Sequence, residues 1–281
     1  MAAPGLDDPG VKNGRVECPG VALSVRSDTR PEHLGSLLWT LIRTDFKSRY
    51  HGTIGGFLWA LLKPFTMFVV LLSVFSYLFV SDPQYRVNLV IGLFLYDFFG
   101  EATKAGLQSL HAKGFLLSKV KFPIWTAVVA SVANAAITLG IFAVVIAVFT
   151  IASGRALRPS LFLLFVVYLL LYLVIVIGFS LAASVLYLRY RDLNQVWDVV
   201  IQAGFFLAPV VYPLTIIPER LHFYLFLWPP TPLVQFSRSV LVDGVVPTAR
   251  AHTFLLVEAA VVFIVGALIF RRYAPRAAEY L

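Results

Sequence analysis

The feature that most constrains this chain is a set of long apolar runs with almost no charge. The run from Ile124 to Ala152 contains no ionisable residue. About 20 apolar residues in a helix cross the hydrocarbon core of a bilayer, and a helix satisfies its own backbone hydrogen bonds there. Of the 281 residues, 59% are hydrophobic and 14% are charged, whereas soluble domains are about half apolar and a quarter charged. The sequence therefore predicts an all-α integral membrane protein.

Six runs are candidate transmembrane helices. They are Phe57–Val80, Val87 to about Ala105, Ile124–Ala152, Leu161–Leu188, Val196–Val211 and Phe254–Phe270. Between the last two runs, residues 213–245 are apolar but repeatedly broken by proline. Because its apolar pieces are too short to cross, we expect two short re-entrant helices there. The alternative, a seventh span, is disfavoured by Pro229, Pro230 and Pro232.

The distribution of lysine and arginine sets the expected orientation. Basic residues gather before the first run, in the loops after the second and fourth runs, and at the C-terminus. Such loops are normally cytoplasmic, so we expect both termini in the cytoplasm. The net charge of +8 then belongs to the membrane surface rather than to a nucleic acid partner. The N-terminus lacks the pattern of a cleaved signal peptide, so the first span is expected to direct insertion.

Residues 29–52 have the pattern of an amphipathic helix. Its less polar face contains Leu34, Leu37, Leu38, Leu41, Ile42, Asp45, Phe46 and Arg49. Arg43 and Lys47 fall on the other side, as in helices that lie at a membrane surface. We expect a flexible cytoplasmic tail over residues 1–28, this interface helix over 29–52, and a transmembrane domain over 53–281. The helix either anchors the first span or forms a wall of a cytoplasmic gate.

The sequence lacks common signatures of catalysis. It has no HExxH, GxSxG or CxxC motif, its histidines have no metal spacing, and Cys18 is its only cysteine. It also lacks a P-loop and cannot itself cradle ATP phosphates in one. We expect no enzyme activity, metal or cofactor in this chain, so uphill transport would draw on another subunit or an ion gradient. A small-molecule efflux permease and, less favoured, a membrane glycosyl- or acyltransferase are also open as functions of this chain.

Three ionisable residues inside the apolar runs are candidate functional groups. Charges within spans are costly and often mark transport paths. Lys63, Asp97 and Glu101 lie at depths that permit an ion pair between the lysine and either acid. Such a pair would be structural or part of a path. Asp198 and Glu258 lie near the ends of their runs, so we expect them to reach headgroups or water.

Two expected inner loops carry further candidates. The first, "HAKGFLLSKVKFPIW" over His111–Trp125, mixes apolar and basic residues and ends its predicted short helix at Pro123. It is either an interfacial anchor or a knob that fits a cleft on a cytoplasmic partner. The second, "YLRYRDLNQVW", places Arg189, Arg191 and Asp192 at the surface.

Four stretches in order resemble the membrane subunit of ABC-type polysaccharide exporters, the Wzm-like class that also includes teichoic-acid exporter permeases. They are "RTDFKSRYHGTIGGFLWALLKP", "KGFLLSKVKFPIW", "YLRYRDLNQV" and "FFLAPVVYPLTIIPERLHFYLFLWPPTPLVQFSR". The resemblance runs from about Leu34 to the C-terminus. It implies a six-span permease of the bacterial cytoplasmic (inner) membrane, with an interface helix, a coupling helix over about 111–123 and a re-entrant region over about 213–245. Where that class often has Asn-Pro, this chain has Pro229-Pro230, which leaves the local turn open.

The resemblance also implies partners and site residues. Two copies would pair with two cytoplasmic ATPase subunits, which bind ATP and Mg, and would export an undecaprenyl-type lipid-linked glycan. The glycan itself is left open between O antigen, capsule, teichoic acid and galactan. Arg43, Lys47 and Arg49 would contact the lipid headgroup at the cytoplasmic entrance, and Arg189, Arg191 and Asp192 would form the second cytoplasmic loop. The coupling helix would use Lys113, Phe115, Leu116, Lys119, Lys121, Phe122 and Pro123.

Overall fold

The computed structural model describes residues 31–50, 56–77, 84–119, 123–155 and 158–277, without some side chains near the ends of these ranges. Within them the regular structure is entirely helical, which confirms the expected all-α class. The elements are α1 (Pro31–Tyr50), α2 (Gly56–Phe75), α3 (Tyr85–Ala112), α4 (Gly114–Lys119), α5 (Ile124–Ala152), α6 (Pro159–Arg189), α7 (Leu193–Leu207), the 3₁₀ turn η1 (Leu214–Ile216), α8 (Glu219–Phe226), α9 (Pro230–Arg238), the π-helical turn η2 (Ser239–Asp243) and α10 (Ala249–Ala277).

Three described helices are long and apolar enough to cross a membrane. They are α5, α6 and the part of α10 from Ala249 to Pro275. In α2, the apolar segment from Leu61 to Phe75 is shorter, and it contains Lys63. α3 spans 28 residues but carries several charges, and α7 spans only 15. These three long helices support the expected integral membrane character.

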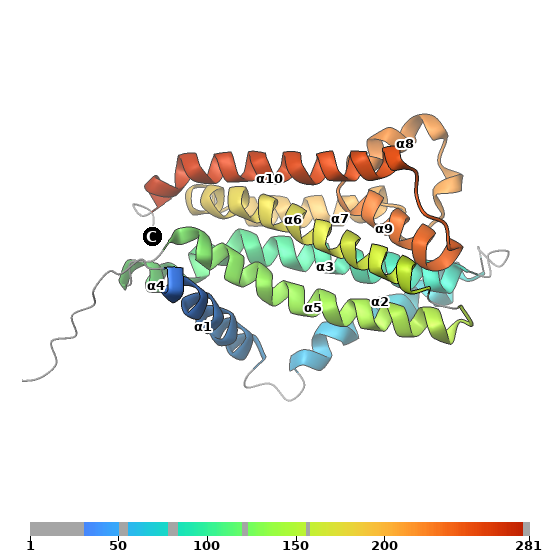
Figure 1. The fold of residues 1–281 in the computed structure, drawn as a ribbon, viewed down its shortest axis with the longest axis horizontal. Coiled ribbons are helices and arrows are strands. Elements are labelled where there is room, and N and C mark those ends of the chain that lie inside the picture. The colour runs from blue at the N-terminus through green and yellow to red at the C-terminus, as the bar shows by residue number, and fades with distance from the viewer. Residues whose placement is uncertain (1–30, 51–55, 78–83, 120–122, 156–157, 278–281) are drawn as a thin grey trace, which may run out of the picture.

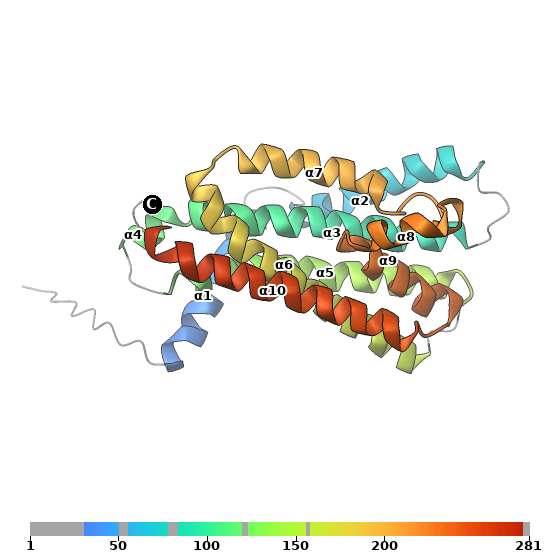
Figure 2. The same ribbon diagram turned by 90° about the horizontal axis from the view of Figure 1, so that it is seen from above.

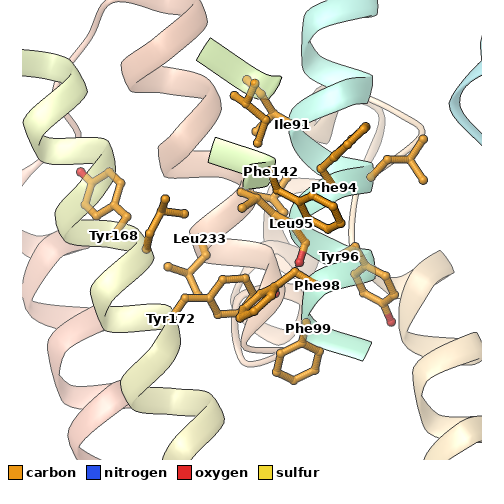
Figure 3. Packing of buried hydrophobic residues seen from close by; sticks show 14 of the residues in the cluster. Ile91, Phe94, Leu95, Tyr96, Phe98, Phe99, Phe142, Tyr168, Tyr172 and Leu233 are labelled. Carbon is orange, nitrogen blue, oxygen red and sulfur yellow. The ribbon is translucent and has the colours of Figure 1, made fainter. Parts of the chain in front are cut away.

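The central element of the bundle is α3. Figure 2 shows α2 and α7 on one side of α3 and α10 on the other. Figure 3 shows Phe94 and Phe99 of α3 in a core with Phe142 of α5 and Tyr172 of α6. The rings of Phe94 and Phe142 meet edge to face at 4.9 Å, and those of Phe99 and Tyr172 stack at 5.7 Å. These are favourable aromatic geometries, and they fix α5 and α6 against α3.

Two glycines lie at a close crossing of α6 and α10. These helices lie side by side along the long axis in Figure 1. A Cβ atom on Gly266 would overlap the carbonyl oxygen of Gly178, and one on Gly178 would lie 2.6 Å from the Cα of Phe263. Small residues at membrane helix crossings let the backbones approach and gain dispersion energy.

α8 and α9 form a hairpin at one end of the bundle, opposite the end that holds α4 and the C-terminal end of α10 (Figure 1). Near its turn, the Trp228 ring packs edge to face on Phe99, about half-way along α3, at 5.6 Å. At the far end of α9, Arg238 bonds to the backbone of Asn88 in the first turn of α3. The hairpin therefore reaches the middle of α3 and returns to the end from which it came. Pro229 and Pro230 suit this turn, because proline is well tolerated where a helix begins.

Candidate functional site

A cavity of about 1010 Å³ lies between α2, α3 and α7. Much of its wall is apolar and aromatic, including Trp59, Tyr96, Phe205 and Phe206. Its charged lining residues are Lys63, Asp97, Glu101, Lys104 and Asp198. The volume is at the upper end of the range for small-ligand pockets, and we call this space the α3 cavity.

The expected ion pair in the apolar runs is present at the α3 cavity. The Lys63 ammonium of α2 lies 3.1 Å from a carboxylate oxygen of Asp97 and 3.3 Å from one of Glu101. Both acids are on α3, one helical turn apart. One lysine thus connects α2 to two carboxylates on the central helix.

A second set of polar contacts joins α3 to α7. The Lys104 ammonium donates to both carboxylate oxygens of Asp198, at 2.7 and 2.8 Å. One turn further along α3, the Gln108 amide donates to Asn194 at 2.7 Å. The Asp198 side chain is 40% exposed beside this pair, so its expected contact with headgroups or water stays a prediction. Asp198 lies near the start of α7, where α3 runs alongside and offers a nearer cation.

Glu258 also differs from its expected place. Both of its carboxylate oxygens are buried within the protein, and they have no hydrogen-bond partner among the described residues. Helix α10 begins at Ala249, ahead of the predicted run from Phe254, so Glu258 is more than two turns inside the helix. Its expected contact with headgroups or water is therefore wrong.

A smaller cavity of about 480 Å³ lies between α1, α3 and α5. Polar side chains dominate its lining, among them Asp45, Gln108 and Asn134. Glu101 and Lys104 line this cavity and the α3 cavity alike. The two spaces therefore adjoin on α3, and we call the smaller one the α1 cavity.

Lys113 fastens the start of α4 to α1 and α5. Only 8% of the residue is exposed. Its ammonium lies 2.5 Å from Asp45 of α1, and it donates to Ser131 and the Ala127 carbonyl of α5 at 2.8 and 3.0 Å. Burial lowers the pKa of Lys113, and the neighbouring Asp45 carboxylate partly opposes that shift. The periodicity of residues 29–52 puts Asp45 on the less polar face of the helix, the side that contacts Lys113. Lys113 was predicted to contact an ATPase, but its side chain is buried within this chain.

The sequence of residues 36–242 matches the family model described as the ABC-2 type transporter. The chain belongs to the ABC-2 type transporter family. It is a multi-pass protein of the bacterial inner membrane.

Relatives of this ABC-2 chain include three named permeases or transport proteins. The O-antigen export system permease protein RfbA of Klebsiella pneumoniae is 26% identical over 252 residues, covering 89% of this chain and 96% of the relative. RfbA of Myxococcus xanthus is 26% identical over 190 residues, covering 66% and 71%. The polysialic acid transport protein KpsM of Escherichia coli is 21% identical over 235 residues, covering 82% and 91%.

Within this ABC-2 chain, the predicted headgroup contacts divide into two groups. Arg43 and Lys47 are exposed on α1, opposite the side that carries Asp45. Arg49 is the penultimate residue of α1, but its side chain is outside the described part. Their role as headgroup contacts stays a prediction.

The predicted ATPase contacts lie at the end of the transporter that holds α4 (Figure 1). Phe115 and Leu116 are exposed on α4, and Pro123 caps the start of α5. The Lys119 side chain and all of Lys121 and Phe122 lie outside the described residues. The second loop exposes its three predicted residues, Arg189, Arg191 and Asp192. Their contacts with an ATPase also stay predictions.

Arg238 is a structural residue of the transporter that the sequence did not single out. Its guanidinium donates to the Asn88 carbonyl of α3 at 2.7 and 3.0 Å. It also donates to the carbonyls of Pro209 and Val210, just past α7, at 2.6 and 2.7 Å. Gly92 leaves room for it, since a Cβ there would lie 2.6 Å from the guanidinium. The only sequence signal was the position of this arginine inside the proline-broken segment, residues 213–245.

Proposed function

We propose that the chain is the permease subunit of an ATP-driven exporter that moves a lipid-linked polysaccharide across the inner membrane. The main observation behind this proposal is the α3 cavity of this membrane transporter. The cavity is large, and its wall combines aromatic rings with charged groups. The names of the relatives, which include O-antigen export permeases, support a glycan as cargo. Aromatic faces pack against the C–H faces of sugar rings, while polar side chains bind their hydroxyl groups.

The proposed topology has six spans. They are α2, α3, α5, α6, α7 and α10, and the α8–α9 hairpin is re-entrant from the outer side. The return of the hairpin from the middle of α3 supports this assignment, as does its shielding by α3 and α6. Both termini are then cytoplasmic, together with α1 and α4.

The proposed assembly contains two copies of this chain and two ATPase subunits, which bind ATP and Mg. Exposed apolar side chains on α2 and α7, among them Trp59 and Phe206, support a second copy on the α2–α7 side. The α3 cavity lies on that side, so pairing would enclose the path between two copies. On α4, the exposed Phe115 and Leu116 would fit a cleft of the ATPase.

The proposed substrate is a glycan on an undecaprenyl-type lipid. Its phosphate-bearing headgroup would meet Arg43, Lys47 and Arg49 on α1 before the glycan enters the α1 cavity and the α3 cavity. Arginine suits this role because its planar guanidinium can donate two hydrogen bonds to one phosphate.

The test is purification of the chain with a candidate P-loop ATPase, followed by reconstitution into liposomes with a lipid-linked glycan. We expect a stable complex, ATP hydrolysis stimulated by the glycan, and movement of the glycan across the bilayer. Phe115→Asp should weaken association with the ATPase, whereas Tyr224→Asp, an exposed aromatic on α8 at the other end, should not. A complex that forms but is indifferent to every lipid-linked glycan would refute the proposed cargo.

A further inference from the structure

We infer that the α3 cavity favours a neutral, hydroxyl-rich glycan chain and disfavours a polyanionic one. The inference rests on the proposed function, because it concerns the cargo of the proposed path. One relative is named for polysialic acid, which is a polyanion, so membership of the family does not set the charge of the cargo.

The charged groups that line the α3 cavity disfavour an anionic chain. Three carboxylates and two ammonium groups line the α3 cavity, from Asp97, Glu101, Asp198, Lys63 and Lys104. Carboxylates therefore outnumber ammonium groups among the described lining residues. A charge in a poorly hydrated passage acts over a longer range than one in bulk water.

Both lysines of the α3 cavity are already paired with carboxylates. The Lys104 ammonium already bonds to both oxygens of Asp198, and Lys63 lies within 3.3 Å of both Asp97 and Glu101. An anionic sugar that recruited either lysine would have to compete with a carboxylate held in place by the helices. It would then lie beside that carboxylate, and like charges at such distances repel.

The uncharged part of the cavity wall suits a sugar chain. The Trp59 and Phe206 residues are 64% and 75% exposed in the single chain, and both line the cavity with Gln202. Aromatic faces offer contact area to the apolar faces of sugar rings. Carboxylate and amide oxygens accept hydrogen bonds from sugar hydroxyl groups, which are donors. These groups suit a chain that is rich in hydroxyls and lacks charge.

The experiment compares two cargoes on the permease–ATPase complex in liposomes. One is a lipid-linked neutral hexose polymer. The other has the same lipid and a similar chain length with one carboxylate-bearing sugar in each repeat. We expect half-maximal stimulation of ATP hydrolysis at a concentration on the order of tenfold lower for the neutral cargo. The repulsion between two unit charges ~10 Å apart in a poorly hydrated passage corresponds to about this factor. Added salt should narrow the difference by screening.

Charge variants test whether the lining causes the preference. Asp97→Asn with Glu101→Gln leaves the lysines in excess and should shift the preference toward the anionic cargo by roughly tenfold. Gln202→Glu should strengthen the preference for the neutral cargo without removing an ion pair. Glu219→Gln, an exposed change on α8 outside the cavity, is the matched control and should leave the ratio unchanged.

The possible failures separate the two proposals. If wild-type complex handles both cargoes alike within about twofold, or if the charge variants leave the ratio unchanged, the charge preference is refuted and the exporter function stands. If neither cargo stimulates the complex, the exporter function itself fails and the preference falls with it.

Discussion

At the scale of single residues, Arg238 holds three backbone segments that are distant in sequence. Its hydrogen bonds join the end of α9 to the first turn of α3 and to the carbonyls that follow α7. Carbonyls at helix ends and in irregular segments must find donors when they are buried. A forked guanidinium can supply several donors at once, which a single ammonium cannot match in geometry.

We predict that Arg238→Lys destabilises the protein although charge is kept. The lysine cannot reach the carbonyls of both α3 and the segment after α7, so buried acceptors lose their donors, at a cost of about 3 kcal/mol. Thermal unfolding of the purified protein in detergent measures this. Arg220→Lys, on the exposed face of α8, is the control. Equal melting temperatures for the two variants would contradict the role assigned to Arg238.

The Lys113–Asp45 pair gives a second prediction. Asp45→Ala leaves the buried ammonium without its carboxylate, whereas Lys113→Met removes the charge and keeps much of the volume. Breaking a buried pair from one side costs about 3 kcal/mol or more, while replacing a buried charge by an apolar group costs less. We therefore expect the melting temperature to fall further for Asp45→Ala than for Lys113→Met. The reverse order would show that the pair is not what holds α1 at this position.

Several of these residue contacts were predictable and others were not. The depth of Lys63 relative to Asp97 and Glu101 followed from helical rise alone, and the pair is present. The partner of Lys104 is 94 residues away in sequence, and no local pattern indicates that α7 lies beside that turn of α3. Lys113 resembled a surface lysine because its loop is basic. Its burial depends on where α1 packs, which is a property of the tertiary structure.

At the scale of elements, the crossing of α6 and α10 depends on two glycines. We predict that Gly266→Leu separates these helices, because its side chain would occupy the position of the Gly178 backbone. Overlap with backbone cannot be relieved by a side-chain rotation, so we expect a loss of folded protein in the membrane fraction. Gly140→Leu on α5 is the matched control, since a Cβ there meets nothing within 4 Å. Equal yields and melting temperatures for both variants would argue against the crossing.

The elements themselves were largely predictable from hydrophobicity, but their boundaries were not. The run expected over Ile124–Ala152 is α5 with the same bounds, because Pro123 precedes it and Ser153 and Gly154 follow it. The run expected from Phe254 begins earlier, at Ala249. Its first turn contains His252, which bonds to Tyr168 of α6 at 2.8 Å. A polar residue that finds a tertiary partner thus extends a helix beyond its apolar run.

At the scale of the whole molecule, the two ends of the bundle differ in composition. One end holds α1, α4 and the basic junction between α6 and α7, and the other holds the α8–α9 hairpin (Figure 1). The described lysines all fall between the start of α1 and the end of α4 in the sequence. The basic residues described at the hairpin end are arginines, among them Arg155, Arg158 and Arg220. This asymmetry is the basis of the proposed orientation, with the hairpin facing outward.

Labelling of introduced cysteines in intact cells tests that orientation. The chain has one cysteine, so Cys18→Ser gives a background without thiols. In that background, we predict that Glu219→Cys on α8 and Ser153→Cys after α5 react with a membrane-impermeant maleimide. Asp192→Cys, between α6 and α7, should react only after the membrane is permeabilised. All three positions are exposed on the described chain, so burial does not account for a difference in labelling.

The labelling pattern also tests the number of spans, because each additional crossing reverses the side of every later position. Ser153 and Asp192 flank α6, so opposite labelling requires that α6 crosses the membrane. Asp192 and Glu219 flank α7, which spans 15 residues and would cross a full bilayer only with the irregular segment that follows it. If Asp192→Cys and Glu219→Cys are labelled from the same side, α7 does not cross, and the six-span topology with its outward-facing hairpin is wrong.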